Sequence, residues 1–344
     1  MTRQGPKFLN LALQGGGSHG AFTWGVLDRL LEQPRLQFEG VSGTSSGAMN
    51  AVVLANGLAR GGREAAREDL SRFWSEIADE VPAGFLQPHP LAALNGDVGV
   101  DAFPALRAYL ELAQHLSPYQ MNPTGLNPIR GVLTRLIDFE RLRDSRSLRV
   151  FISATHVRTG KVRIFDNAEL SVEALLASAC LPSLHHAVEV GGEVYWDGGF
   201  SGNPPVFPLI FNCLHADILV VMLQPVHSGD LPASAEAIQR RQMEISFNSA
   251  FLREMRAIAV CKEQIRSGWF QSGRLETRLE KLKIHIVEAQ QLMEELDAGS
   301  RYNTLPSFLQ MLKEEGRAHA DSWLRDNYVD IGQRSNVDLV GLFC

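Results

Sequence analysis

The feature that most constrains this chain is a short apolar segment, residues 38–42, that runs through Gly43-Thr44-Ser45-Ser46-Gly47 into a helix of small residues. In a Gly-x-Ser-x-Gly segment the serine stands on a sharp strand-to-helix turn, and the glycines are needed because a Cβ would collide across the bend. Ser45 is the serine of this frame. A serine that merely caps a helix is the commoner arrangement, so the segment alone identifies Ser45 only as a candidate nucleophile.

A second glycine-rich segment, Gly15-Gly16-Gly17-Ser18-His19-Gly20, follows an apolar run that predicts a first buried strand. Backbone N–H groups in such a turn are unobstructed and can point at one oxygen, so residues 15–18 are candidates for an oxyanion hole beside Ser45. The same segment satisfies G-x-G-x-x-G, and Glu39 follows at the distance of a ribose-binding acid. A dinucleotide-binding α/β enzyme is therefore an alternative. We favour the oxyanion hole because Glu39 leads directly into the Ser45 turn.

A third segment, Asp197-Gly198-Gly199, follows a predicted hairpin over residues 187–196. An aspartate before two glycines is often only a tight turn. A serine hydroxyl, however, is a weak nucleophile until a base accepts its proton. Asp197 is our candidate for that base, with Gly43, Gly47, Gly198 and Gly199 shaping the two turns.

The order of predicted elements indicates the fold class. Strands alternate with helices, which favours a mainly parallel sheet covered on both faces. Residues 81–130 are rich in Pro and Gly and predict an excursion from the sheet, either a lid or a structural cap. We expect a core over residues 1–225 and a helical extension with a late strand over residues 226–344, packed on the same domain.

Composition excludes several classes of protein. The chain has 344 residues, 45% of them hydrophobic, and a formal net charge of -6, which argues against a surface devoted to nucleic acid. Its four cysteines lack the spacing of a zinc site, so we expect free thiols in a reducing compartment and no metal or cofactor. No signal peptide or membrane span is predicted, so we expect a cytoplasmic protein, peripheral at membranes if bound to them. Export without a Sec-type signal and the oligomeric state stay open.

With these three motifs in this order, the sequence resembles the patatin-like phospholipase family over roughly residues 8–225. The resemblance implies a three-layer α/β/α sandwich that hydrolyses lipid acyl esters with a Ser45–Asp197 pair, no histidine, and the glycine loop as oxyanion hole. The resemblance does not decide whether the substrate is a phospholipid, a lysophospholipid or a neutral ester. A non-catalytic lipid-binding scaffold on the same fold is the weaker alternative, because Ser45, Asp197 and the glycine loop are all present.

A histidine triad is the competing mechanism. If Asp197 is its acid, the histidine follows it, and the candidates are His215, His227, His285 and His319. None of them has a motif around it. His19 lies in the glycine loop, where a packing role is the commoner one.

Charge is unevenly distributed along the extension. Residues 240–283 carry ten Lys and Arg against five Glu. A basic helical face can attract anionic lipid headgroups, worth about 1 kcal/mol per well-placed Lys or Arg. The alternative is a solvated helix whose charges only keep it soluble.

Overall fold

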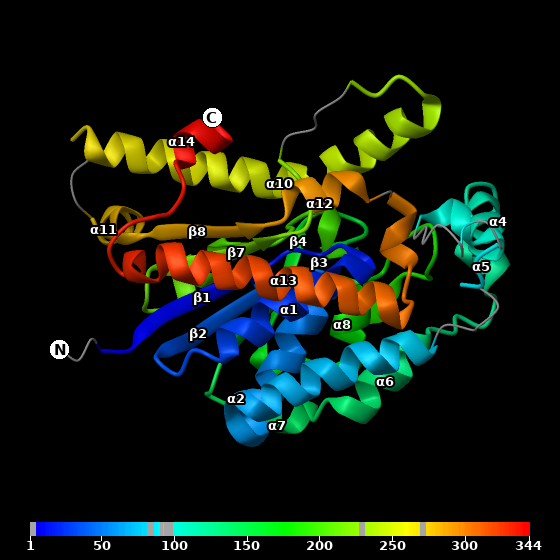
Figure 1. The fold of residues 1–344 in the computed structure, drawn as a ribbon, viewed down its shortest axis with the longest axis horizontal. Helices are drawn as coiled ribbons and strands as arrows, with labels where there is room; N and C mark the ends of the chain where they lie inside the picture. Colours follow the sequence, from blue (N-terminus) through cyan, green and yellow to red (C-terminus); the bar gives the residue numbers. More distant parts are fainter. Residues whose placement is uncertain are drawn as a thin grey trace.

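A computed structural model describes residues 5–80, 86–89, 92, 99–226, 231–268, 273–296 and 298–344. Its centre is an eight-stranded sheet in the order β5-β6-β3-β2-β1-β7-β8, with β4 paired to β3 (Figure 1). The strands are β1 (Lys7–Leu13), β2 (Leu36–Gly43), β3 (Arg149–His156), β4 (Val162–Asp166), β5 (Val188–Val190), β6 (Glu193–Asp197), β7 (Asp217–Met222) and β8 (Lys283–Glu288).

The sheet is mostly parallel. Strands β3, β2, β1, β7 and β8 run parallel to one another, and β4, β5 and β6 add antiparallel pairs at one side. Parallel strands end at the same edge of a sheet, so the loops after β1 and β2 lie together there. The predicted α/β fold with helices on both faces of a mainly parallel sheet is confirmed.

Helices cover both faces of the sheet. One face carries α1 (Gly20–Leu31), α2 (Ser46–Glu80), α6 (Pro128–Leu136), α7 (Phe139–Asp144), α8 (Val172–Ser178) and α13 (Pro306–Asn327). The other carries α9 (Phe207–Asn212), α10 (Ala235–Arg266) and α14 (Leu339–Phe343). The alternation of side chains along a strand produces this division. In β7, Leu219 and Val221 belong to the first core, whereas Ile218, Val220 and Met222 belong to the second.

Residues beyond 226 contribute to the same sheet and to both layers. Strand β8 pairs with β7, and α13 lies across α1. The two helices approach closely because each has a glycine at the crossing: a Cβ on Gly25 would meet the carbonyl of Lys313, and one on Gly316 would meet that of Phe22.

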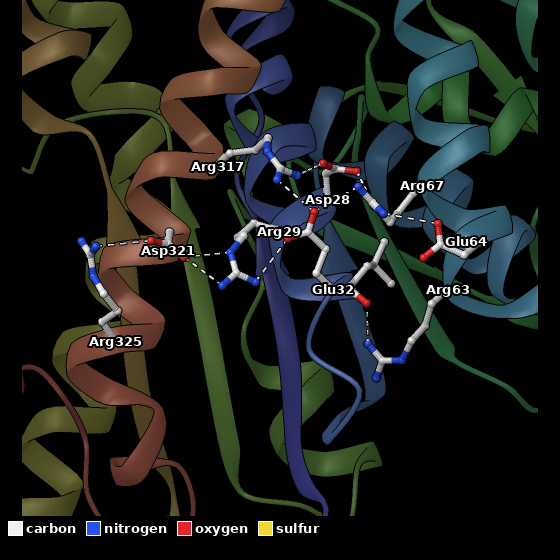
Figure 2. Close-up of polar contacts among 10 residues, drawn as sticks. Asp28, Arg29, Glu32, Arg63, Glu64, Arg67, Arg317, Asp321 and Arg325 are labelled. Carbon is white, nitrogen blue, oxygen red and sulfur yellow. Dashed lines mark hydrogen bonds and ion pairs between the residues drawn. The ribbon is translucent and has the colours of Figure 1, made fainter.

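A cluster of charged side chains extends this contact (Figure 2). Asp28 of α1 accepts from Arg67 of α2 at 2.8 Å and pairs with Arg317 of α13, while Glu32 pairs with Arg317 at 2.9 Å and Arg67 at 3.1 Å. Three helices from distant parts of the chain are thereby joined.

The Pro-rich excursion is only partly described, because residues 81–85, 90–91 and 93–98 of the predicted lid or cap lie outside the described residues. Helices α4 (Pro104–Leu112) and α5 (Pro118–Met121) stand at one end of the molecule (Figure 1). Phe103 and Leu106 are buried in a small cluster that includes the partly buried Tyr302 and Leu305. The excursion therefore packs on the segment that precedes α13.

None of the helices in the described part of the chain is both long and apolar enough to cross a membrane. The remaining helices are α11 (Arg274–Lys281), which contacts α10, and α12 (Gln290–Glu295).

Candidate active site

Ser45 stands on a strained turn between β2 and α2. Its φ of 55° places it in the left-handed region. Among the described residues, Ser45 is the only non-glycine residue with a positive φ. Such a conformation costs about 1–3 kcal/mol, and residues that adopt it cluster at active sites and ligand clamps. The flanking glycines are needed for close approach: a Cβ on Gly43 would lie 2.5 Å from the carbonyl oxygen of Gly47, and one on Gly47 would meet the carbonyl of Leu13.

Buried hydroxyl groups hold this turn. The backbone N–H of Ser45 donates to Oγ of Ser178, at 2.9 Å, and Ser178 is completely buried at the end of α8. Oγ1 of Thr44 lies 2.6 Å from Oγ of Ser153 and donates to the carbonyl of Gly202 at 2.6 Å. The turn is thus tied to β3, to α8 and to the segment after β6.

Asp197 lies at the end of β6 and is 1% exposed. Its Oδ1 accepts from the N–H of Gly199 at 2.7 Å, whereas Oδ2 has no hydrogen-bond partner among the described residues. Burial raises the pKa of Asp197 to about 7, and hydrogen bonding from the Gly199 N–H and from the Ser45 side chain opposes that shift.

The Ser45 side chain is close enough to the Asp197 carboxyl to oppose the rise in its pKa, but Oδ2 has no hydrogen-bond partner among the described residues. Catalytic hydrogen bonds are often long in a free enzyme and tighten when substrate binds. The fold therefore brings together Ser45 and Asp197, which are far apart in the sequence.

The glycine-rich loop lies directly against the Ser45 turn. A Cβ on Gly15 would lie 2.6 Å from the carbonyl oxygen of Thr44 and 2.8 Å from Cβ of Ser45. Gly17 has a φ of 61°, and a Cβ there would lie 2.5 Å from the carbonyl oxygen of Arg301. Glycine is needed at position 15 because the chains approach closely there. At position 17 it is needed for close approach and also for the positive φ.

The four N–H groups predicted for the oxyanion hole differ in their partners. The N–H of Gly15 donates to Oδ1 of Asn203 at 2.7 Å, and that of Gly16 donates to Oγ of Ser46 at 3.0 Å. The N–H groups of Gly17 and Ser18 donate to no described residue. The N–H groups of Gly15 and Gly16 are therefore occupied within the protein. Those of Gly17 and Ser18 are available to a ligand.

A buried amide cluster supports this loop, and it was not expected from the sequence. Gln14 donates from Nε2 to Oδ1 of Asn248 in α10 at 2.9 Å and accepts from the N–H of Leu223 at 2.6 Å. Gln14, Asn203 and Asn248 belong to no recognisable motif. Gln14 precedes the glycine loop and Asn203 closely follows Asp197-Gly198-Gly199, whereas Asn248 carried no signal in the sequence.

The candidate histidines in the described part of the chain have partners other than Ser45 and Asp197. His19 contacts Oγ of Ser300 through Nε2 at 2.8 Å, and burial together with the cation of Arg301 lowers its pKa to about 3, so it is neutral. The later histidines have partners of their own: His215 pairs with Glu39, His285 pairs with Asp217, and His319 contacts the carbonyl of Glu315. His227 lies outside the described residues. The described histidines form no hydrogen bond to Ser45 or Asp197.

Glu39, the acid of the dinucleotide alternative, is also occupied. Its carboxylate accepts from the N–H of Leu214 at 2.6 Å and from the N–H of His215 at 2.8 Å, besides the contact with the His215 ring. These contacts leave no acid here to hold a ribose.

Solved structures of other proteins resemble this chain at low sequence identity. VipD from Legionella pneumophila has a TM-score of 0.42 and 14% identity, covering 94% of this chain and 67% of VipD. The type III effector protein ExoU has a TM-score of 0.33 and 16% identity, covering 94% of this chain and 53% of ExoU. A structure of SpcU in complex with ExoU from Pseudomonas aeruginosa has a TM-score of 0.28 and 15% identity, covering 95% of this chain and 79% of the matched chain. Values this low establish no shared activity, and no curated protein matches the sequence.

The family comparison is more specific. Residues 11–210 match the sequence model described as Patatin-like phospholipase. The match spans more than half of the chain and contains the glycine loop, Ser45 and Asp197. The chain belongs to the patatin-like phospholipase family.

Proposed function

We propose that this chain is a serine hydrolase that cleaves lipid esters, of the phospholipase A or lysophospholipase type, through an acyl-enzyme on Ser45 with Asp197 as its base. Membership of the family supports a lipid acyl hydrolase in general. The observation that supports the mechanism most is the buried Asp197 carboxyl, whose pKa is about 7, beside the hydroxyl on the strained turn. A base with a pKa near the working pH is suited to accept and return a proton.

In the first half of the reaction, Oγ of Ser45 attacks the ester carbonyl carbon while its proton passes to Oδ2 of Asp197. The carbonyl oxygen becomes an oxyanion, which the N–H groups of Gly17 and Ser18 stabilise. When the intermediate collapses, the bond to the alcohol breaks and Asp197 returns the proton to the departing oxygen. The acyl group then remains on Ser45.

In the second half, Asp197 takes a proton from water, and the resulting hydroxide attacks the acyl carbon. Collapse of this intermediate breaks the bond to Oγ and returns the proton to Ser45. The products are a carboxylic acid and the free enzyme. No histidine is required because one carboxyl group serves both steps.

A hydrolysis panel tests this proposal. Purified protein is offered diacyl phospholipids, lysophospholipids, neutral glycerides and a short-chain water-soluble ester, and released acid is measured. Ser45→Ala should abolish release from every substrate that the wild type cleaves, whereas Ser147→Ala, at an exposed serine before β3, should change nothing. Equal activity in Ser45→Ala would contradict the proposal, and an inactive wild type across the panel would favour the scaffold alternative.

A further inference from the structure

A cavity lies at the opposite end of the sheet from Ser45. Its volume is about 220 Å³, and it opens where β7 and β8 begin. Ser45 follows the other end of the parallel strands, and a strand of six or seven residues spans about 20 Å. This cavity, which we call the α11 cavity, is therefore separate from the candidate active site.

One wall of the α11 cavity is cationic. Arg274, Arg278 and Lys281 all line it. Residues spaced by four and three positions lie on the same face of a helix, so α11 directs three positive side chains to one side. None of the three pairs with a carboxylate among the described residues. Arg278 is fixed in place because it donates to the carbonyls of Ile210 and Cys213 at the end of α9.

The remaining lining adds little negative charge. Ile210, Ile218 and Leu282 supply an apolar floor, and His215 stands at one side. The nearby carboxylate of Glu39 is occupied by the ring and the N–H of His215. The lining therefore holds three cations and no carboxylate, although the whole chain has a net charge of -6.

The structure also divides the basic segment 240–283 that the sequence singled out. Lys262 donates to the carbonyls of Leu279 and Leu282, at 2.7 Å each, and so caps the end of α11. Burial, together with neighbouring cations, lowers its pKa to about 8. Lys262 has a structural role, whereas the cations of α11 line a cavity.

We propose that the α11 cavity binds a phosphate group. Three cations around a small volume match a compact anion with more than one negative charge, and arginine offers paired donors to phosphate oxygens. The apolar floor accommodates the carbon atoms next to a phosphoester. The phosphate can come from a soluble phosphate compound or from an anionic lipid headgroup, and the exposed Leu214 at the rim is compatible with a lipid surface.

Two binding measurements distinguish these sources. Calorimetric titration with inorganic pyrophosphate tests the soluble source, and flotation with phosphatidylcholine vesicles, with and without phosphatidic acid, tests the headgroup. Wild-type protein should bind in at least one arm. The double variant Arg274→Gln/Lys281→Gln should weaken that binding at least tenfold, and Arg278 is left unchanged because it holds α9.

The matched control is Arg253→Gln/Arg256→Gln, which removes the same charge from exposed positions of α10 that do not line the cavity. It should bind like the wild type. Equal losses in the two double variants would show a diffuse charge effect and overturn the proposal, as would the absence of binding in both arms. Hydrolysis does not enter either readout, so failure of the proposed function leaves this test intact.

Discussion

The N–H of Gly15 and Oδ1 of Asn203 lie 2.7 Å apart in a hydrogen bond that turns the first N–H of the glycine loop into the protein. Asn203 is completely buried, and its backbone carbonyl oxygen accepts from Nε2 of Gln14 at 3.3 Å. This contact fixes the orientation of the loop that continues through Gly17 and Ser18. We infer that Asn203 is a positioning residue for the proposed oxyanion hole.

Replacing Asn203 by alanine should therefore lower kcat more than it raises KM. The loop would lose an anchor and the buried N–H of Gly15 would lose its partner, at a cost of about 1–3 kcal/mol in the free energy of unfolding. Steady-state kinetics on a soluble ester and urea unfolding measure the two effects. Asn212→Ala, which removes a contact to Pro208 at the end of α9, is the control and should leave kcat unchanged. An unaltered kcat in Asn203→Ala would show that the hydrogen bond has only a structural role.

We assign different roles to the neighbouring Ser45 and Ser46, and substitution should separate them. Ser45→Ala and Asp197→Asn should each remove most of the activity, and the double variant should lose no more than either alone because one proton-transfer unit is broken in all three. Ser46→Ala should retain partial activity, since it removes only the acceptor of the Gly16 N–H. A fluorophosphonate probe should modify Ser45, and peptide mapping locates the modified serine. Labelling confined to another serine, or an inactive Ser46→Ala, would require a different nucleophile.

The fold was predictable because its signals are local. Strands buried on both faces leave apolar runs. The first buried strand predicted before the glycine loop is β1, and the late strand predicted in the extension is β8. Short helices such as α7 and α9 were missed because six residues are too few to show a period. Gly61 and Gly62 mark the kink in α2: both have non-helical backbone angles and separate its two helical parts.

The candidate site was predictable only where glycines mark the backbone. The three motifs located Ser45, Asp197 and the loop, and the pairing of the first two remains a prediction about catalysis. The sequence could not indicate that Asn203 and Ser46 take up the N–H groups of Gly15 and Gly16, because such contacts depend on segments that meet only in the fold. The same holds for Ser178 beneath the turn.

The contact among α1, α2 and α13 should respond to the loss of one carboxylate. Asp28 is 5% exposed and pairs with both Arg67 and Arg317 (Figure 2). Asp28→Asn should lower the free energy of unfolding by about 2 kcal/mol, which is less than for a fully buried pair because the arginines reach solvent. Glu64→Gln, at an exposed carboxylate that also contacts Arg67, should cost close to nothing. Equal effects in urea unfolding would mean that the cluster acts as surface charge only.

The raised pKa of Asp197 predicts opposite pH dependences for activity and stability. The base must be ionised, so kcat/KM on a soluble ester should rise with pH and level off above an apparent pKa of about 7. Stability changes in the other direction, because a carboxyl whose pKa is raised on folding contributes stability that is complete below the ordinary aspartate pKa of 3.8 and is lost as pH rises through about 7. Asp197→Asn keeps an acceptor for the Gly199 N–H and carries no charge. Its midpoint of thermal unfolding should therefore exceed that of the wild type at pH 8, with the difference disappearing near pH 4. A variant less stable than the wild type at both values, or a wild-type rate independent of pH between 5 and 8, would remove Asp197 from the role of base.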